Sequence, residues 1–226
     1  MKILTFDTSL DKTYITLSID EQMVSDVVIE NHDEKYHSAY LIPALVNILK
    51  NNSLTMQDID VIGTNIGPGS FTGIRSCVTV ARVMAQQINC PLVGVSSLEI
   101  LSKINESYKK TIVVLDARKK QFYTAVYENS KELKKPELTS ADTVKSMDFE
   151  NTFVIADKTS CEFLKEFGVN ASVYTDLNMD LGKYLNKIVC EKIKRASNEE
   201  FVWAKLKPLY LQAPPVTISA KNKSDF

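Results

Sequence analysis

Four of the seven glycines in this 226-residue chain fall between residues 63 and 75, in the stretch GTNIGPGSFTGIR. An apolar run (residues 60–66) precedes the stretch and a run with helical periodicity (residues 74–88) follows it. Glycine permits backbone angles and close approaches that side chains forbid. The sequence therefore predicts a strand, a tight glycine loop and a helix, which is a setting where helix N–H groups can meet an anion.

The common phosphate-loop patterns do not match this loop. A Walker A loop would need a lysine, and a dinucleotide loop would need its third glycine at position 72, which is threonine. Two interpretations stay open, an anion site or a tight turn in which Thr72 caps the following helix. The residues of interest in the loop are Gly67, Pro68, Gly69, Ser70, Thr72, Gly73 and Arg75.

The loop and two further segments carry a family resemblance. IGPGSFTGIR (66–75), TVAR (79–82) and PLVGVSSLE (91–99) resemble the bacterial TsaB (YeaZ) family of tRNA threonylcarbamoyladenosine biosynthesis proteins. The resemblance is dense from 58 to 101 and thins after about 135. It implies an α/β fold of the actin-like (ribonuclease H-like) class, with two lobes and duplicated mixed sheets. The few elements that can be read past residue 135 predict that the second lobe is reduced.

Composition limits the classes of function. The net charge of −1 gives no overall field that would attract nucleic acid or an anionic membrane. The four cysteines lack CxxC spacing and lie in apolar segments, which favours buried free thiols over a disulfide framework or a zinc site. No signal peptide and no membrane-spanning run is recognised, so a cytoplasmic protein is expected.

A weak internal repeat supports two lobes. Residues 4–7, a turn and residues 13–19 resemble residues 114–116, a turn and residues 121–127, and in both places an apolar strand ends in Asp and returns after a polar turn. Two unrelated hairpins are the alternative. We expect an N-terminal lobe over 1–100, a smaller C-terminal lobe over 101–212 and a mobile tail over 213–226.

The two repeat turns hold the candidate phosphate-binding residues, Asp7, Thr8, Ser9 and Asp116. Neither turn contains glycine, and no Gly-Gly pair occurs anywhere in the chain. Backbone N–H groups therefore cannot close tightly on a phosphate. We expect no cofactor bound by this chain alone, and the alternative role of each Asp is to end a strand and form a turn.

A metal site is not expected either. In the catalytic relative TsaD, the resemblance places two histidines four residues apart, where this chain has Ser97 and Leu101. The chain's own histidines, His32 and His37, are interpreted as an exposed polar helix start. No catalytic residue is assigned.

Two helices have more apolar surface than one core needs. The apolar arc of the helix predicted over 36–50 spans about twice the roughly 100° of a helix on a single core. Ala39, Ile42 and Val46 on this helix, with Val80 and Val83 on the next, form a candidate partner interface. A deep core covered by loops is the alternative.

The resemblance implies a non-catalytic subunit that pairs with TsaD, with the small ATPase TsaE joining the complex. The complex would modify the adenosine next to the tRNA anticodon, using ATP and a metal held by the partners. Contact of this chain with tRNA is expected to be indirect or weak, and a homodimer is compatible with the isolated protein. The alternative is an enzyme, either a sugar-kinase-like phosphotransferase or a peptidase.

Overall fold

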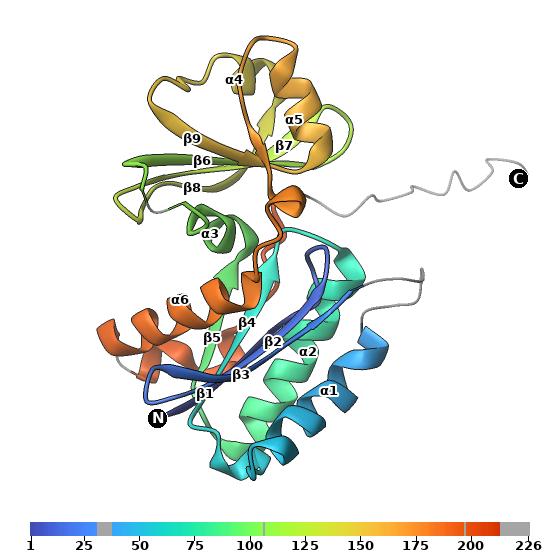
Figure 1. Ribbon diagram of the computed structural model, residues 1–226, viewed down its shortest axis with the longest axis vertical. Coiled ribbons are helices and arrows are strands. Elements are labelled where there is room, and N and C mark those ends of the chain that lie inside the picture. Colours follow the sequence, from blue (N-terminus) through green and yellow to red (C-terminus); the bar gives the residue numbers. More distant parts are fainter. Residues whose placement is uncertain (31–37, 106, 197, 213–226) are drawn as a thin grey trace, which may run out of the picture.

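The structure is a computed structural model that describes residues 1–30, 38–105, 107–196 and 198–212. It has two lobes, each built on a five-stranded sheet (Figure 1). The first sheet and the helices that follow its strands are β1 (Lys2–Asp7), β2 (Thr13–Ile19), β3 (Gln22–Ile29), α1 (Ser38–Asn51), η1 (Met56–Asp58), β4 (Val61–Gly67), α2 (Phe71–Ile88), β5 (Leu92–Ser96) and α3 (Ser97–Ser102).

The first sheet has the strand order β3-β2-β1-β4-β5. Strand β1 pairs antiparallel with β2 and parallel with β4. A hairpin meander therefore forms one half of the sheet, and crossovers through helices form the other half. Because β1 and β4 are parallel neighbours, Asp7 and Gly67 end their strands at the same edge of the sheet.

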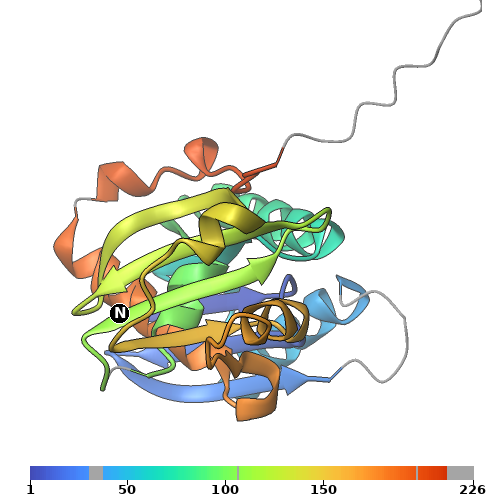
Figure 2. The ribbon, with the colours of Figure 1, turned by 90° about the horizontal axis from the view of Figure 1, so that it is seen from above.

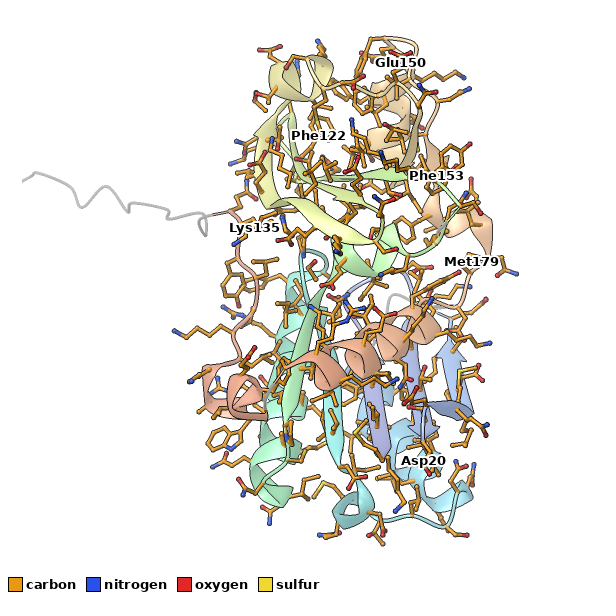
Figure 3. All side chains as sticks on the ribbon, turned by 90° about the vertical axis from the view of Figure 1, so that its left-hand side faces the viewer. Asp20, Phe122, Lys135, Glu150, Phe153 and Met179 are labelled. Atoms are coloured by element: carbon orange, nitrogen blue, oxygen red, sulfur yellow. The ribbon has the colours of Figure 1, made fainter. Side chains whose placement is uncertain are left out.

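Helices cover both faces of the first sheet. Leu4 on β1 belongs to the core shared with Leu41 of α1 and Cys77 of α2. Its neighbour Ile3 belongs to the opposite core, with Val189 of α6 (Leu181–Arg195). Successive strand residues point to opposite faces, so β1 serves both cores. Figure 3 shows α6 lying across the first sheet, below the second lobe.

The second lobe repeats the topology of the first. Its sheet has the order β8-β7-β6-β9-β10, in which β6 pairs antiparallel with β7 and parallel with β9. This confirms the internal repeat predicted from the two hairpins. Seen from above, this sheet lies over the first lobe (Figure 2). Its elements are β6 (Lys110–Asp116), β7 (Gln121–Glu128), β8 (Lys131–Ser140), α4 (Ala141–Lys145), β9 (Thr152–Ala156), α5 (Lys158–Lys165), β10 (Ser172–Val173) and η2 (Tyr174–Leu177).

The predicted reduction of the second lobe is visible in the lengths of its elements and not in the number of strands. Strand β10 has two residues, and helices α4 and α5 have five and eight. Helix α6, which follows in the chain, packs on β1, β2 and β5 of the first sheet. The first lobe thus includes residues 181–195 as well as the expected 1–100, and η3 (Asn198–Phe201) and η4 (Trp203–Lys205) come after them.

Several local expectations need correction. Helix α2 begins at Phe71 instead of 74, and its N-cap is Ser70 instead of Thr72, because the Ser70 hydroxyl accepts a hydrogen bond from the Gly73 N–H. The short helix that follows β5 ends at Ser102. The predicted tail over 213–226 lies outside the described residues, as do His32 and His37.

Candidate functional site

The glycine loop packs against the turn between β1 and β2. A Cβ atom added to Gly73 would lie 2.0 Å from the Thr8 carbonyl oxygen, and one added to Gly69 would lie 2.5 Å from the Ser9 carbonyl oxygen. The Ser70 N–H donates to that same Ser9 oxygen at 2.9 Å. Chain-to-chain contact therefore explains these two glycines, which supports the tight-turn interpretation over the anion site.

Asp7 is buried, with 2% of its surface exposed, and its carboxylate is held by neighbouring donors. Oδ1 accepts from the Ser9 N–H at 2.7 Å and the Ser9 hydroxyl at 2.6 Å, and Oδ2 accepts from Asn65 Nδ2 at 3.1 Å. Burial raises the pKa of Asp7, while the hydrogen bonds from Ser9 and Asn65 oppose that rise. The carboxylate thus stabilises its own turn.

Thr8 is also turned inward. Its hydroxyl donates to the Gly73 carbonyl at 2.9 Å, and its N–H lies 2.9 Å from Cys77 Sγ. Burial, followed by the nearby Asp7, raises the pKa of the Cys77 thiol to about 12, so this thiol stays protonated. The structure brings Asp7, Thr8 and Ser9 together as expected, with all three buried.

Asp116 occupies the matching place in the second lobe but is half-buried. Its Oδ1 accepts from the Arg118 N–H at 2.8 Å, and its own N–H donates to Asp157 Oδ2 at 2.6 Å. The other oxygen of Asp157 caps α5 by accepting from the Ser160 N–H at 2.8 Å. Sequence reasoning missed Asp157, although its position before a short helix is a capping signal.

Carboxylates of both lobes act on the phenol of Tyr174. Burial raises the pKa of Tyr174, and Asp11, Asp157 and Asp7 raise it further. The Tyr14 hydroxyl donates to Asp11 Oδ1 at 3.1 Å. Such a concentration of negative charge opposes the binding of phosphate unless a cation is present. Among the described residues, no group of three or more His, Cys, Asp or Glu side chains is arranged to hold a metal ion.

The positions that the resemblance assigns to metal ligands are filled by core contacts. Ser97 and Leu101 are fully buried in α3. The Ser97 hydroxyl donates to Asn65 Oδ1 at 3.0 Å, and the same oxygen accepts from the Gly67 N–H at 2.8 Å. Asn65 thus joins α3 to the Asp7 turn through side-chain hydrogen bonds.

Helices α1 and α2 carry exposed apolar side chains. Ile42 and Val46 are each 57% exposed and Val83 is 60% exposed, while Val80 is half-buried. The outward direction predicted for Ile42, Val46 and Val83 is therefore observed, whereas the prediction for Val80 is wrong, because Val80 packs against the core that includes Cys77. Ala39 lies within α1, but its side chain falls outside the described part of the structure.

Arg75, the last residue of the predicted loop set, belongs to an exposed cluster at the start of α2. Its guanidinium carbon lies 3.9 Å from the ring centroid of Phe71, and its Nε donates to the Tyr210 hydroxyl at 3.2 Å. The Phe71 and Tyr210 ring centroids are 5.9 Å apart. Pro68 lies in the buried part of the loop and Thr72 in the exposed first turn of α2.

Two hollows lined by described residues lie in the second lobe. One, of about 320 Å³, lies between α5 and β10 and includes Lys158, Cys161 and Asp176 in its lining. The other, of about 360 Å³, includes Lys110 and Leu133. Neither includes the turn at Asp7 in its lining. None of the helices that the structure describes is long and apolar enough to cross a membrane.

A family model described as "TsaD: tRNA N6-adenosine threonylcarbamoyltransferase" matches residues 25–202. The chain belongs to this family. Its curated relatives include the tRNA threonylcarbamoyladenosine biosynthesis protein TsaB of Bacillus subtilis, 33% identical over 129 residues, which are 57% of this chain and 56% of that protein. TsaB of Buchnera aphidicola from Schizaphis graminum is 31% identical over 128 residues, or 55% of this chain and 60% of that protein. The chain thus spans little more than half the length of these curated relatives.

A solved structure agrees with the fold. YeaZ from Pseudomonas aeruginosa superposes with a TM-score of 0.71 at 18% identity, covering 93% of this chain and 100% of that one. The expected α/β fold of two lobes with duplicated mixed sheets is therefore confirmed. Together with the TsaB relatives, the family match supports a role in making threonylcarbamoyladenosine in tRNA.

Proposed function

We propose that this chain is a non-catalytic cytoplasmic subunit that pairs with TsaD to make N6-threonylcarbamoyladenosine next to the tRNA anticodon. TsaE would join the complex, and ATP and metal would be bound by these partners. The names of the relatives support the assignment to this pathway. The role within it is inferred from the residues of this chain.

The exposed apolar face of α1 and α2 carries the proposal. Ile42 and Val46 lie one helical turn apart on α1, and Val83 lies on the neighbouring α2. Each is more than half exposed, although the two helices bury a separate apolar face in the core with Leu41 and Ala81. A second apolar face on adjacent helices fits a helical partner, which would bury the surface that water now contacts.

The turn at Asp7 supports the non-catalytic assignment. A carboxylate that already accepts three hydrogen bonds has little capacity left for a metal or a reacting proton. Ser97 and Leu101 offer no imidazole, although the family's description names a transferase. The enzyme alternatives, a phosphotransferase or a peptidase, gain no specific support from these contacts. Calorimetric titration of the isolated protein with ATP and magnesium tests the phosphotransferase alternative. A phosphotransferase must bind ATP and would give a measurable heat of binding, whereas the proposed subunit should give none.

Charge substitutions test the interface. Val46→Asp or Val83→Glu should abolish pairing with TsaD, and also any homodimer, because an unpaired charge buried at an interface costs several kcal/mol. The melting temperature should change little, since both side chains face water in the free chain. A pull-down with TsaD and analytical ultracentrifugation measure the effect.

Leu133→Asp is the matched control, since Leu133 is 64% exposed but lies on β8 of the second lobe. It should leave pairing intact. If Val46→Asp unfolds the protein, the residue belongs to the core. If the variant stays folded and still pairs, the partner uses another surface and the proposal fails.

A further inference from the structure

The turn between β6 and β7 has a backbone that its sequence does not favour. Arg118, Lys119 and Lys120 all have positive φ, of 64°, 52° and 58°. Residues with a Cβ atom rarely adopt this region, and three in succession without glycine or asparagine are costly. Such conformations concentrate where ligands are held. The hairpin turns at Asp20–Glu21 and Asn129–Ser130 also have positive φ, but in two residues each, so the third such residue sets this turn apart.

The same turn presents donors and positive charge to solvent. All three basic side chains are exposed. The Arg118 N–H is used by Asp116, but within the described part of the chain the N–H groups of Lys119 and Lys120 make no hydrogen bond. Free backbone donors beside three cations are suited to phosphate oxygens.

The aromatic cluster at the start of α2 is linked to the residue that follows this turn through the segment after Tyr210. Tyr210 contacts Phe71 and Arg75, and Gln212, two residues further on, donates from Nε2 to Gln121 Oε1 at 3.4 Å. Two extended residues span at most about 7 Å. The Leu209 N–H donates to the Ile66 carbonyl at 2.8 Å, which fixes this segment on the first lobe. The segment ends between the lobes, on the side where α2 begins (Figure 1).

Aromatic rings of the first lobe and cations of the second lobe thus lie on segments that the Gln212–Gln121 hydrogen bond joins. Phe71 and Tyr210 are each 50% exposed, and although the Arg75 guanidinium lies over one face of Phe71, exposed aromatic rings are stacking platforms for bases. Two of the chain's four arginines, Arg75 and Arg118, lie here, although the chain as a whole carries a charge of −1. A local cluster of positive charge on a nearly neutral protein is typical of a surface that binds nucleic acid.

We propose that this surface, formed by Phe71, Arg75, Tyr210 and the turn Arg118–Lys119–Lys120, binds single-stranded RNA directly. The rings would stack on unpaired bases and the turn would contact the phosphates, as proteins that read RNA loops do. This departs from the indirect or weak contact expected from the sequence. That the RNA is tRNA rests on the proposed function, whereas the surface itself does not.

Fluorescence anisotropy with a labelled tRNA anticodon stem-loop tests the proposal on the full chain. The triple variant Arg118→Gln, Lys119→Gln, Lys120→Gln should weaken binding at least tenfold and lower the slope of log K against log salt by about 2, at about 0.7 per phosphate contact. The control triple Lys131→Gln, Lys158→Gln, Lys165→Gln removes the same charge from exposed positions elsewhere and should change affinity less than twofold.

The double variant Phe71→Leu, Tyr210→Leu should weaken binding about tenfold without changing the salt slope, because it removes stacking and no charge. The proposal is overturned if wild-type protein does not bind the stem-loop, if the control triple is equally impaired, or if ATP competes as well as unlabelled RNA. Pull-down with TsaD is measured on the same variants. If the triple variant Arg118→Gln, Lys119→Gln, Lys120→Gln no longer pairs with TsaD, the turn belongs to the partner interface and the RNA-binding proposal is overturned. If RNA binding fails while pairing with TsaD is intact, the RNA-binding proposal is overturned and the proposed function stands.

Discussion

The two hairpin turns of this duplicated fold both begin with an aspartate, but one turn is buried and the other is exposed. After Asp7, the residues Thr8 and Ser9 are buried, and the glycine loop packs on their backbone. After Asp116, the residues Arg118–Lys120 are exposed and adopt positive φ. The first turn lies in the protein's interior, whereas the tip of the second turn is exposed, charged and strained in its backbone. The duplicated topology therefore does not imply duplicated function, since each turn depends on what packs against it.

The largest effect is expected where a Cβ atom would break the first turn. Gly73→Val should lower the free energy of unfolding by about 3–4 kcal/mol, because its Cβ would lie 2.0 Å from the Thr8 carbonyl oxygen. Urea denaturation measures the loss. Gly168→Val is the control, since nothing lies within 4 Å of a Cβ there and its φ of +82° alone should cost about 1 kcal/mol. Equal losses for the two variants would show that the glycine loop is not closely packed.

A smaller effect is expected from changing the acid itself. Asp7→Asn should cost about 2 kcal/mol, because an amide cannot accept from all three donors. Asp116→Asn, in the half-buried turn, should cost less than about 1 kcal/mol. A reversed order would mean that the second turn is the one stabilised by its carboxylate.

The pH dependence sharpens this test. Since burial raises the pKa of Asp7 above 3.8 in the folded state, the folded protein binds this proton more tightly than the unfolded chain does. Asp7 therefore favours folding at low pH, and this contribution is lost as pH rises from about 3.8 through the raised pKa. The stability advantage of wild type over Asp7→Asn should shrink over that range and then stay level. An advantage that grows with pH would contradict a raised pKa.

The smallest effect has the opposite sign and comes from the second turn. Lys119→Gly removes a Cβ atom whose strain at positive φ costs the folded state about 1–2 kcal/mol. Glycine also gives the unfolded chain more conformational freedom, which destabilises the folded state by about 0.5–1 kcal/mol. A net gain of about 0.5–1 kcal/mol in unfolding free energy follows. Thermal denaturation detects it. Lys131→Gly, within strand β8, has no strain to relieve and should be destabilising by a similar amount. A loss of stability in both variants would remove the evidence of strain.

The position of the glycine loop could be predicted from the sequence, but its contacts could not. Gly73 meets Thr8 across more than sixty residues, and no local pattern encodes which backbone will approach. The cap was misplaced because Ser70 and Thr72 have the same capping chemistry two residues apart. Asp157 could be read as a helix cap, yet its bond to the Asp116 N–H depends on the parallel pairing of β6 with β9.

The region past residue 135 was hard to predict for a different reason. Strand β8 is an exposed edge strand containing Pro136 and several lysines, so it lacks the apolar alternation that marks a half-buried strand. The amphipathic pattern of α6 marks a buried face, but such a pattern does not identify the sheet that the face covers. The outward side chains on α1 and α2 were predictable because helical periodicity alone separates Ile42 and Val46 from the core position Leu41.

Helix α6 also has a consequence during synthesis on the ribosome. Leu185, Ile188 and Val189 cover a face of the first sheet whose strands are all made by residue 96. A Cβ added to Gly63 of β4 would lie 2.4 Å from a methyl group of Val189, so the match is close. One apolar face of the nascent first lobe therefore stays uncovered by α6 until the entire second lobe has been translated. That interval is when this chain is most exposed to aggregation, and when a chaperone would have most to protect.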